Sequence, residues 1–185
     1  MLNPGRVAAV RGMSAIDEGE PHGTWETVAR GLSPRDRALA NFLLQGTLRN
    51  RPHVDGALNR VLKQPVHTLD VPARATLRVG CFEALYGRTP RRAVVHQFVE
   101  ASKRVGAHRA KGLINAVLRR VQPLDKPAGA EIHGHPDWLM ERWEARFGVD
   151  VARRWAEANQ HAAPTSIVVR DGTAPPQPLV EAAIL

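Results

Sequence analysis

The chain has 185 residues, with 26 Lys or Arg and 18 Asp or Glu, so its formal net charge at pH 7 is +8. Apolar residues make up 43%, which excludes wholesale disorder, and the single cysteine, Cys81, excludes a disulfide framework and a cysteine-based zinc site. No apolar run approaches the roughly 18 residues of a membrane span, and the N-terminus lacks the apolar core of a secretory signal. We therefore expect a cytoplasmic protein without membrane contact.

Apolar residues at helical spacing predict helices through the first 122 residues, without a convincing strand. Val7, Val10 and Met13 mark the first helix, over 6–16. The later helices are expected after Ser33, around Val54, after Asp70, from Thr89-Pro90 to Arg104, and from about His108 to Val121. Short connections between such helices are typical of a compact bundle, so the predicted fold class is all-α.

The strongest helix start lies at Ser33, a capping residue that is followed by Pro34 at the first helical position. Asp36 stands three residues after the cap, where an acidic side chain completes the pattern. The helix behind this start is expected to bury Leu39, Phe42, Leu43 and Leu48.

Composition changes after residue 122. Residues 123–135 combine Pro and Gly without periodicity and are predicted to be a linker. Two helices, roughly 136–147 and 150–160, and a β-like run over 166–169 follow. Because the chain stops inside the apolar segment 178–185, we expect residues 136–185 to be a short, truncated α+β segment.

Positive charge is concentrated in the last two helices of the predicted bundle. Residues 88–120 contain nine basic residues and one acid, Glu100, so they account for the whole net charge. Arg outnumbers Lys 22 to 4 over the chain, and its planar fork of donors suits phosphate and stacks on bases. A clustered basic segment of this kind indicates a protein that binds a polyanion.

At about 100° per residue, each of these two helices separates an apolar stripe from a basic one. The basic faces consist of Arg92, His96 and Lys103 on the first helix, and of Lys111, Asn115 and Arg119 on the second. The core side of the second helix consists of Leu113, Ile114, Val117, Leu118 and Val121. The predicted RNA-binding residues are Arg88, Arg91, Arg92, Lys103, Arg104, Arg109, Lys111, Asn115, Arg119 and Arg120.

Other conspicuous residues favour structural roles. Cys81 lies in an apolar stretch and is expected to be a buried, inert thiol with a raised pKa. Gly112 is expected to allow close helix packing, with close approach of RNA as the alternative. The aromatic rings of Trp138, Trp143 and Trp155 are expected to pack rather than stack on bases. The pair His133 and His135 lacks further ligands at suitable spacing, so no metal site is predicted.

The segment RTPRRAVVHQFVEASKRVGAHRAKGLINAVLRRVQ (88–122) resembles the NusB-type RNA-binding helical domain, most recognisably in KGLINAVLRR. The upstream SPRDRALANFLLQGTLR also fits that domain. HPDWLMERWEARFG (135–148) and WAEANQHAAPTSIVVR (155–170) resemble the junction found in bacterial 16S ribosomal RNA (cytosine-5) methyltransferases of the RsmB/Sun family. There a NusB-like domain precedes the catalytic part.

The resemblance implies a NusB-like domain over 1–122, the linker over 123–135, and an incomplete start of the methyltransferase N-terminal subdomain over 136–185. It implies that the chain positions RNA, with small-subunit ribosomal RNA as the expected partner. The full-length family uses S-adenosylmethionine and catalytic cysteines. This sequence has no Gly-rich nucleotide fingerprint and no suitable cysteine, so no cofactor and no catalytic residue are expected in this chain.

Two alternative functions stay open. A transcription antitermination factor of the NusB type would bind RNA together with a ribosomal protein, although the tail from His135 onward argues against it. A protein-docking module would use the same basic face for an acidic partner or for its own missing methyltransferase domain.

Overall fold

The computed structural model describes residues 2–20, 24–125 and 134–160, and every element in this part of the chain is helical. In chain order the elements are α1 (Pro4–Asp17), α2 (Thr24–Val28), α3 (Pro34–Arg49), α4 (Arg51–Asn59), the 3₁₀ turn η1 (Val66–Thr68), α5 (Val71–Tyr86), α6 (Arg91–Arg104), the 3₁₀ turn η2 (His108–Ala110), α7 (Lys111–Arg120), α9 (Asp137–Phe147) and α10 (Val149–Gln160). The all-α prediction is thus confirmed. The β-like run 166–169 and the apolar segment 178–185 lie outside the described residues.

Side-chain caps fix the starts of α1 and α3 and join them. The Ser33 hydroxyl accepts a hydrogen bond from the backbone N–H of Asp36 at 3.2 Å, as the sequence predicts. The Asn3 side chain accepts from the N–H of Arg6 at 3.3 Å, and its amide donates to Asp36 at 2.8 Å. The two caps therefore hold the N-termini of α1 and α3 together.

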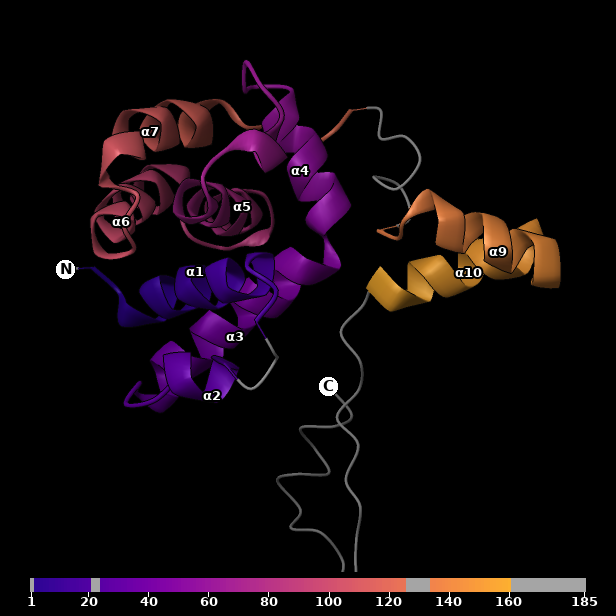
Figure 1. The fold of residues 1–185 in the computed structure, drawn as a ribbon, viewed down its shortest axis with the longest axis horizontal. Helices are drawn as coiled ribbons and strands as arrows, with labels where there is room; N and C mark the ends of the chain where they lie inside the picture. The colour runs from indigo at the N-terminus through magenta and orange to yellow at the C-terminus, as the bar shows by residue number, and fades with distance from the viewer. Residues whose placement is uncertain (1, 21–23, 126–133, 161–185) are drawn as a thin grey trace, which may run out of the picture.

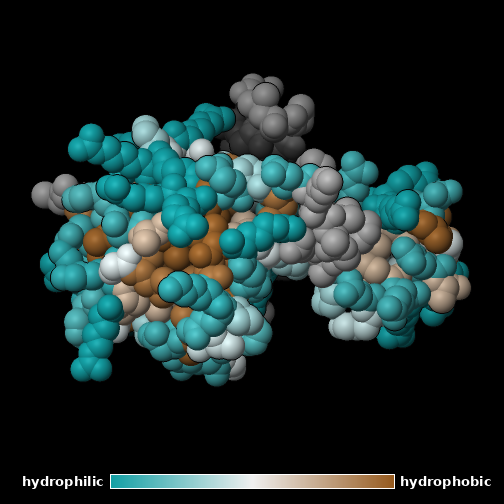
Figure 2. Space-filling view, turned by 90° about the horizontal axis from the view of Figure 1, so that it is seen from above, coloured by the Kyte–Doolittle hydropathy of each residue, from teal (hydrophilic) through white to brown (hydrophobic). Residues whose placement is uncertain are grey.

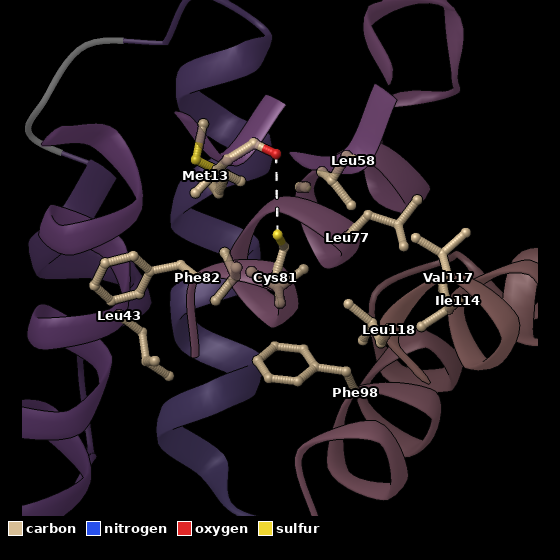
Figure 3. Close-up of a cluster of buried hydrophobic side chains, with 14 of the residues drawn as sticks. Met13, Leu43, Leu58, Leu77, Cys81, Phe82, Phe98, Ile114, Val117 and Leu118 are labelled. Carbon is tan, nitrogen blue, oxygen red and sulfur yellow. Dashed lines mark hydrogen bonds between the residues drawn. The ribbon is translucent and has the colours of Figure 1, made fainter. Parts of the chain in front are cut away.

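Helix α5 is the centre of the bundle, and Figure 1 shows it almost end-on between its neighbours. It contacts α1, α3, α4, α6 and α7, and its side chains are buried continuously from Ala75 to Glu83. A helix enclosed in this way must pair its charged residues inside the bundle. Figure 3 shows Leu77, Cys81 and Phe82 of α5 directed into the cluster that surrounds it.

A glycine sets how closely α6 and α7 approach α5. A Cβ atom at Gly80 would lie 2.7 Å from a methyl group of Leu118 and 3.1 Å from the Phe98 ring. Both neighbours are fully buried and appear in Figure 3 on the side of α5 that faces α6 and α7. Any larger residue at this position would push the two basic helices outward.

The expected burial of Phe42 is wrong, because its side chain is 48% exposed. The buried face of α3 is centred on Ala40, Leu43 and Leu44, and Phe42 lies beside that face with its ring 5.4 Å from that of Phe82. Leu39 is half-buried and packs against the core, whereas Leu43 is fully buried as expected.

A buried charge network joins the C-terminal end of α1 to α4 and α5. The Asp17 carboxylate is 0% exposed and accepts hydrogen bonds from Arg51 (3.0 Å), Arg74 (2.8 Å) and Arg78 (2.6 Å). Arg78, 2% exposed, also donates two bonds to Asp55, at 2.8 and 2.7 Å. Burial disfavours the charged guanidinium, but the hydrogen bonds and charges of Asp55 and Asp17 outweigh it and raise the pKa of Arg78.

A second buried pair joins the other end of α1 to α5. The Arg6 guanidinium donates to both carboxylate oxygens of Glu83, one of them at 2.8 Å. The Thr89 hydroxyl, just before α6, donates to the same carboxylate at 2.7 Å. Helices α1 and α5 are therefore paired by charge at both ends, and the start of α6 is attached to this pair.

The last two helices have a small cluster of their own. Met140 of α9 and Ala152 and Ala156 of α10 are buried, and Trp143 packs against them. Trp143 and Trp155 meet edge to face, with ring centroids 6.0 Å apart, which agrees with the expected packing of these rings. Trp138 differs, since its side chain is 63% exposed, and Trp155 remains 43% exposed at the edge of this cluster. Leu124, which the sequence assigns to the linker, is buried in the core of the bundle.

Within the part of the chain that the structure describes, no helix has the length and apolar character needed to cross a membrane.

Loss of the Asp17 carboxylate is expected to destabilise the bundle strongly. Asp17→Ala leaves Arg74 without a carboxylate and Arg78 with one carboxylate in a buried site, which corresponds to about 3 kcal/mol of unfolding free energy. Urea unfolding followed by circular dichroism measures the change. Glu26→Ala, which removes the exposed ion pair with Arg37, is the matched control and should cost less than about 1 kcal/mol. Equal effects of the two variants would contradict the assigned role of the network.

Candidate nucleic-acid interface

A short turn brings the two basic helices side by side. Helix α6 ends at Arg104, Gly106 adopts a φ of +84°, and η2 leads directly into α7. A positive φ is readily available only to glycine, so this residue allows the chain to reverse within a few residues. Phe98 of α6 and Ile114 and Leu118 of α7 are buried in the common core. The outer flanks of the two helices therefore face the same space.

That space is a groove of about 630 Å³ between α6 and α7, which we call the cationic groove. Its lining consists of Arg91, Arg92, Val95, His96, Val99, Asn115 and Arg119. None of these seven residues is acidic. Arg92, His96 and Arg119 are exposed, and no ion pair among the described residues joins Arg92 or Arg119 to a carboxylate. The groove can therefore present its charges to an anion.

Arg91 has a different role from its neighbours, although it also borders the groove. Its guanidinium donates to the backbone carbonyls of Leu118 (3.3 Å) and Val121 at the end of α7. It also donates to the carbonyl of Ala84 in α5 at 3.4 Å. Cations stabilise the C-terminal end of a helix, where carbonyl groups lack intrahelical partners. Arg91 thus holds α5, α6 and α7 together rather than extending into solvent.

The one acid of the basic segment is already engaged. Glu100 accepts a hydrogen bond from the Lys103 ammonium group on the next turn of α6, and this bond, together with nearby positive charge, lowers the pKa of Glu100. The carboxylate remains ionised at neutral pH and partly neutralises Lys103. Lys103 is consequently a weaker candidate for phosphate binding than Arg92 or Arg119.

The structure brings together four of the ten predicted RNA-binding residues in the cationic groove, namely Arg91, Arg92, Asn115 and Arg119. The other six are exposed at positions outside its lining: Arg88, Lys103, Arg104, Arg109, Lys111 and Arg120. Val95 and Val99 form an apolar part of the lining, and Val95 also belongs to the buried core at 5% exposed. Both valines lie next to Arg92 and His96 on the helical wheel, and this position could have indicated that they line the groove.

The expected core position of Leu113 is wrong, because its side chain is 39% exposed. The buried stripe of α7 contains Ile114, Val117 and Leu118, and Leu113 lies to one side of it. There it lines a second hollow of about 420 Å³, together with Val61, Leu62, Lys63, Gln64, Leu69, Ala116, Val117 and Arg120. We call this hollow the apolar groove. Figure 2 shows an apolar patch ringed by hydrophilic side chains on the face that includes α7 and the loop after α4.

The expected packing role of Gly112 is also wrong. A Cβ atom at this position would meet nothing within 4 Å, and the residue is exposed. Gly112 lies on the face of α7 that carries Asn115 and Arg119, at spacings of three and seven residues. Because Gly112 has no side chain, the backbone of α7 is exposed at this position, next to the cationic groove.

Cys81 is not a candidate nucleophile. Its thiol is fully buried in α5 and directed toward the carbonyl of Val54 at 3.9 Å, as the dashed line in Figure 3 shows. Burial, reinforced by the negative charge of Asp55, raises the pKa of Cys81 far above its usual value. The thiol is therefore neutral and inaccessible, as the sequence predicts.

Fold and groove together define an all-helical bundle in which α6 and α7 form a cationic groove without acidic lining residues. The NusB family matches residues 5–123. The chain therefore belongs to the NusB family.

Two named bacterial proteins are also similar to this chain in sequence. The chain is 37% identical over 146 residues to ribosomal RNA small subunit methyltransferase B of Xanthomonas campestris pv. campestris, covering 77% of this chain and 33% of that protein. It is 42% identical over 130 residues to the protein of the same name from Thermus thermophilus, covering 70% and 31%. The chain thus spans about one third of the length of these relatives.

A solved structure shares the overall fold. The crystal structure of PH0851 superposes with a TM-score of 0.70 at 14% sequence identity, covering 89% of this chain and 40% of that chain. Similarity at this level of identity supports the fold alone.

Adjacent arginines in α6 are expected to differ in their contribution to stability. Arg91→Ala removes hydrogen bonds to three carbonyl groups and should lower the unfolding free energy by about 1–3 kcal/mol. Arg92→Ala, one residue away and exposed, should change it by less than about 0.5 kcal/mol. Thermal and urea unfolding of both variants provide the comparison. A stability loss in Arg92→Ala as large as that in Arg91→Ala would contradict this assignment.

The Cys81 thiol is expected to resist modification in the folded protein. Under native conditions at neutral pH, a disulfide reagent that releases a chromophore should react only as fast as the bundle opens, because the thiol is buried and protonated. In urea the same reagent should label one thiol per chain. Rapid, complete labelling of the native protein would show that the thiol is accessible.

Proposed function

We propose that this chain is the RNA-positioning module of an S-adenosylmethionine-dependent ribosomal RNA cytosine-5 methyltransferase, and that small-subunit ribosomal RNA is its partner in the cytoplasm. The observation that carries the proposal is the cationic groove, where Arg92 and Arg119 lie exposed without an acidic residue in the lining. Guanidinium groups in this arrangement attract phosphate oxygens, and neutralising phosphates releases counterions. The named relatives support ribosomal RNA as the class of target.

The cationic groove does not fit S-adenosylmethionine, the methyl donor that the name of the relatives implies. This cofactor is a sulfonium cation whose ribose hydroxyl groups are commonly bound by a carboxylate. The cationic groove offers arginines and no carboxylate, so its charge opposes such a ligand. We therefore assign no step of methyl transfer to these residues. The proposed division into a binding bundle over 1–122, a linker over 123–135 and a separate segment over 136–185 agrees with this role.

Protein docking is a second candidate function, which the apolar groove favours. Leu113 is exposed there among apolar neighbours, and Lys63 and Arg120 stand at the same hollow. An acidic partner, or the rest of a longer polypeptide, would suit this surface. Transcription antitermination has no comparable support, since the curated relatives described above are named as methyltransferases.

RNA binding through the cationic groove is tested by charge reversal. In the full chain, Arg92→Glu with Arg119→Glu should weaken binding of a fluorescently labelled single-stranded RNA at least tenfold. The salt dependence should also fall, by about 0.7 in the slope of log K against log salt for each phosphate that the protein no longer neutralises. Fluorescence anisotropy at several salt concentrations measures both quantities.

The matched control is Arg142→Glu with Arg153→Glu, which changes the net charge equally at exposed positions of α9 and α10. This variant should retain most of the affinity. If its affinity falls as far as that of the groove variant, the binding is a response to net charge and the proposed interface is wrong. Circular dichroism confirms that both variants remain folded.

A further inference from the structure

The cationic groove contains side chains that phosphate binding alone does not require. Its arginines lie beside the partly exposed side chain of Val99, beside the small part of Val95 that the core leaves accessible, and beside the amide of Asn115. Phosphate groups are solvated anions and gain nothing from contact with valine. An apolar strip between cations suits a ligand that has both a charged backbone and a flat apolar face.

The size of the groove limits that ligand further. A volume of about 630 Å³ falls within the range of about 300–1,000 Å³ that is typical of small-molecule sites. An RNA duplex presents phosphates and riboses on its outside and keeps its bases stacked, so it would span the groove without filling it. A single unstacked nucleotide can place its base between α6 and α7 while its phosphates reach the flanking arginines.

Asn115 offers the polar contact that such a base needs. Its side chain is half-buried in the groove, and its amide has no hydrogen-bond partner among the described residues. An amide presents one acceptor and two donors, and it can pair with the edge of a nucleobase through two hydrogen bonds. A half-buried amide that makes no bond within its own fold is available for this contact.

We propose that the cationic groove takes one unstacked nucleobase of a single-stranded RNA, with Asn115 contacting the edge of the base, Val99 contacting its face, and Arg92 and Arg119 binding the adjoining phosphates. This inference rests on the proposed function and deepens it, because it makes Asn115 a specificity-determining residue. Gly112 lies on the same face of α7 and has open space above it, so the strand can continue past the groove over bare backbone.

The test uses the full chain and oligouridine RNAs that carry a single central adenosine, cytidine or guanosine. The wild-type protein should discriminate among them by at least about fivefold, the lower limit for one good pair of base contacts. A duplex RNA of the same length should bind more weakly than any of them. Fluorescence anisotropy at constant salt gives the ratios of affinity.

Two substitutions at Asn115 separate base contact from general affinity. Asn115→Leu keeps the size of the side chain and removes its hydrogen bonds, so the ratios should approach one while the salt dependence remains. Asn115→Asp keeps the shape and presents acceptors only, so the preference should move toward guanosine, whose N1–H and N2–H groups donate. Ratios that stay the same in both variants, or a duplex that binds as tightly as the single strands, would overturn the proposal.

The same assay distinguishes this failure from failure of the proposed function. If Arg92→Glu with Arg119→Glu weakens binding while the Asn115 variants keep the wild-type ratios, the groove binds RNA through phosphates only and the base contact is wrong. If the double reversal leaves binding unchanged, the RNA interface itself is wrong.

Discussion

Pairing of charges between α1 and α5 is the interaction on which the rest of this molecule depends. Arg6 meets Glu83 at one end of α1, and Asp17 meets Arg74 and Arg78 at the other. Both carboxylates are essentially inaccessible to water, so each is strongly disfavoured unless its partners are in place. The two pairs fix the position of α1 along α5, and α5 in turn contacts every other long helix of the bundle.

This pairing also explains why the surface charge of α6 and α7 remains uncompensated. Asp17, Asp55 and Glu83 are occupied by arginines of α1, α4 and α5. Glu100, the one acid of the segment 88–120, is occupied by Lys103 within its own helix. These carboxylates are therefore paired with other residues of the bundle. Arg92 and Arg119 remain exposed on a groove whose lining contains no acidic residue. A net charge of +8 becomes a localised feature rather than a diffuse one.

Helix positions could be predicted from the sequence because caps, prolines and apolar spacing are local signals. Ser33 with Pro34 marks the start of α3, and Asp70 that of α5, where the structure places them. Burial is harder to predict, because it depends on which flank of a helix a neighbour covers. Phe42 and Leu113 lie at the edges of apolar stripes, and each is exposed because its neighbouring helices approach the centre of the stripe instead.

The groove itself was only partly predictable. The helical wheel places Arg92 and His96 on one face of α6 and Asn115 and Arg119 on one face of α7, and the structure unites these faces. It could not show that Arg91 turns inward, because the carbonyl groups it binds become neighbours only when α5, α6 and α7 pack. Nor could it show that Asp17, Asp55 and Glu83 pair with arginines of other helices, because these partners are distant in sequence.

Helix α7 separates two surfaces of opposite character through neighbouring residues. Arg119 lines the cationic groove and Arg120 the apolar groove, because successive residues of a helix point about 100° apart. A ligand in one groove therefore leaves the other accessible. RNA binding beside α6 and protein contact beside the loop after α4 are compatible within one molecule. Both surfaces depend on the same buried stripe of Ile114, Val117 and Leu118, so a change in the packing of α7 alters the two together, whereas a change at Arg119 or Leu113 alters one.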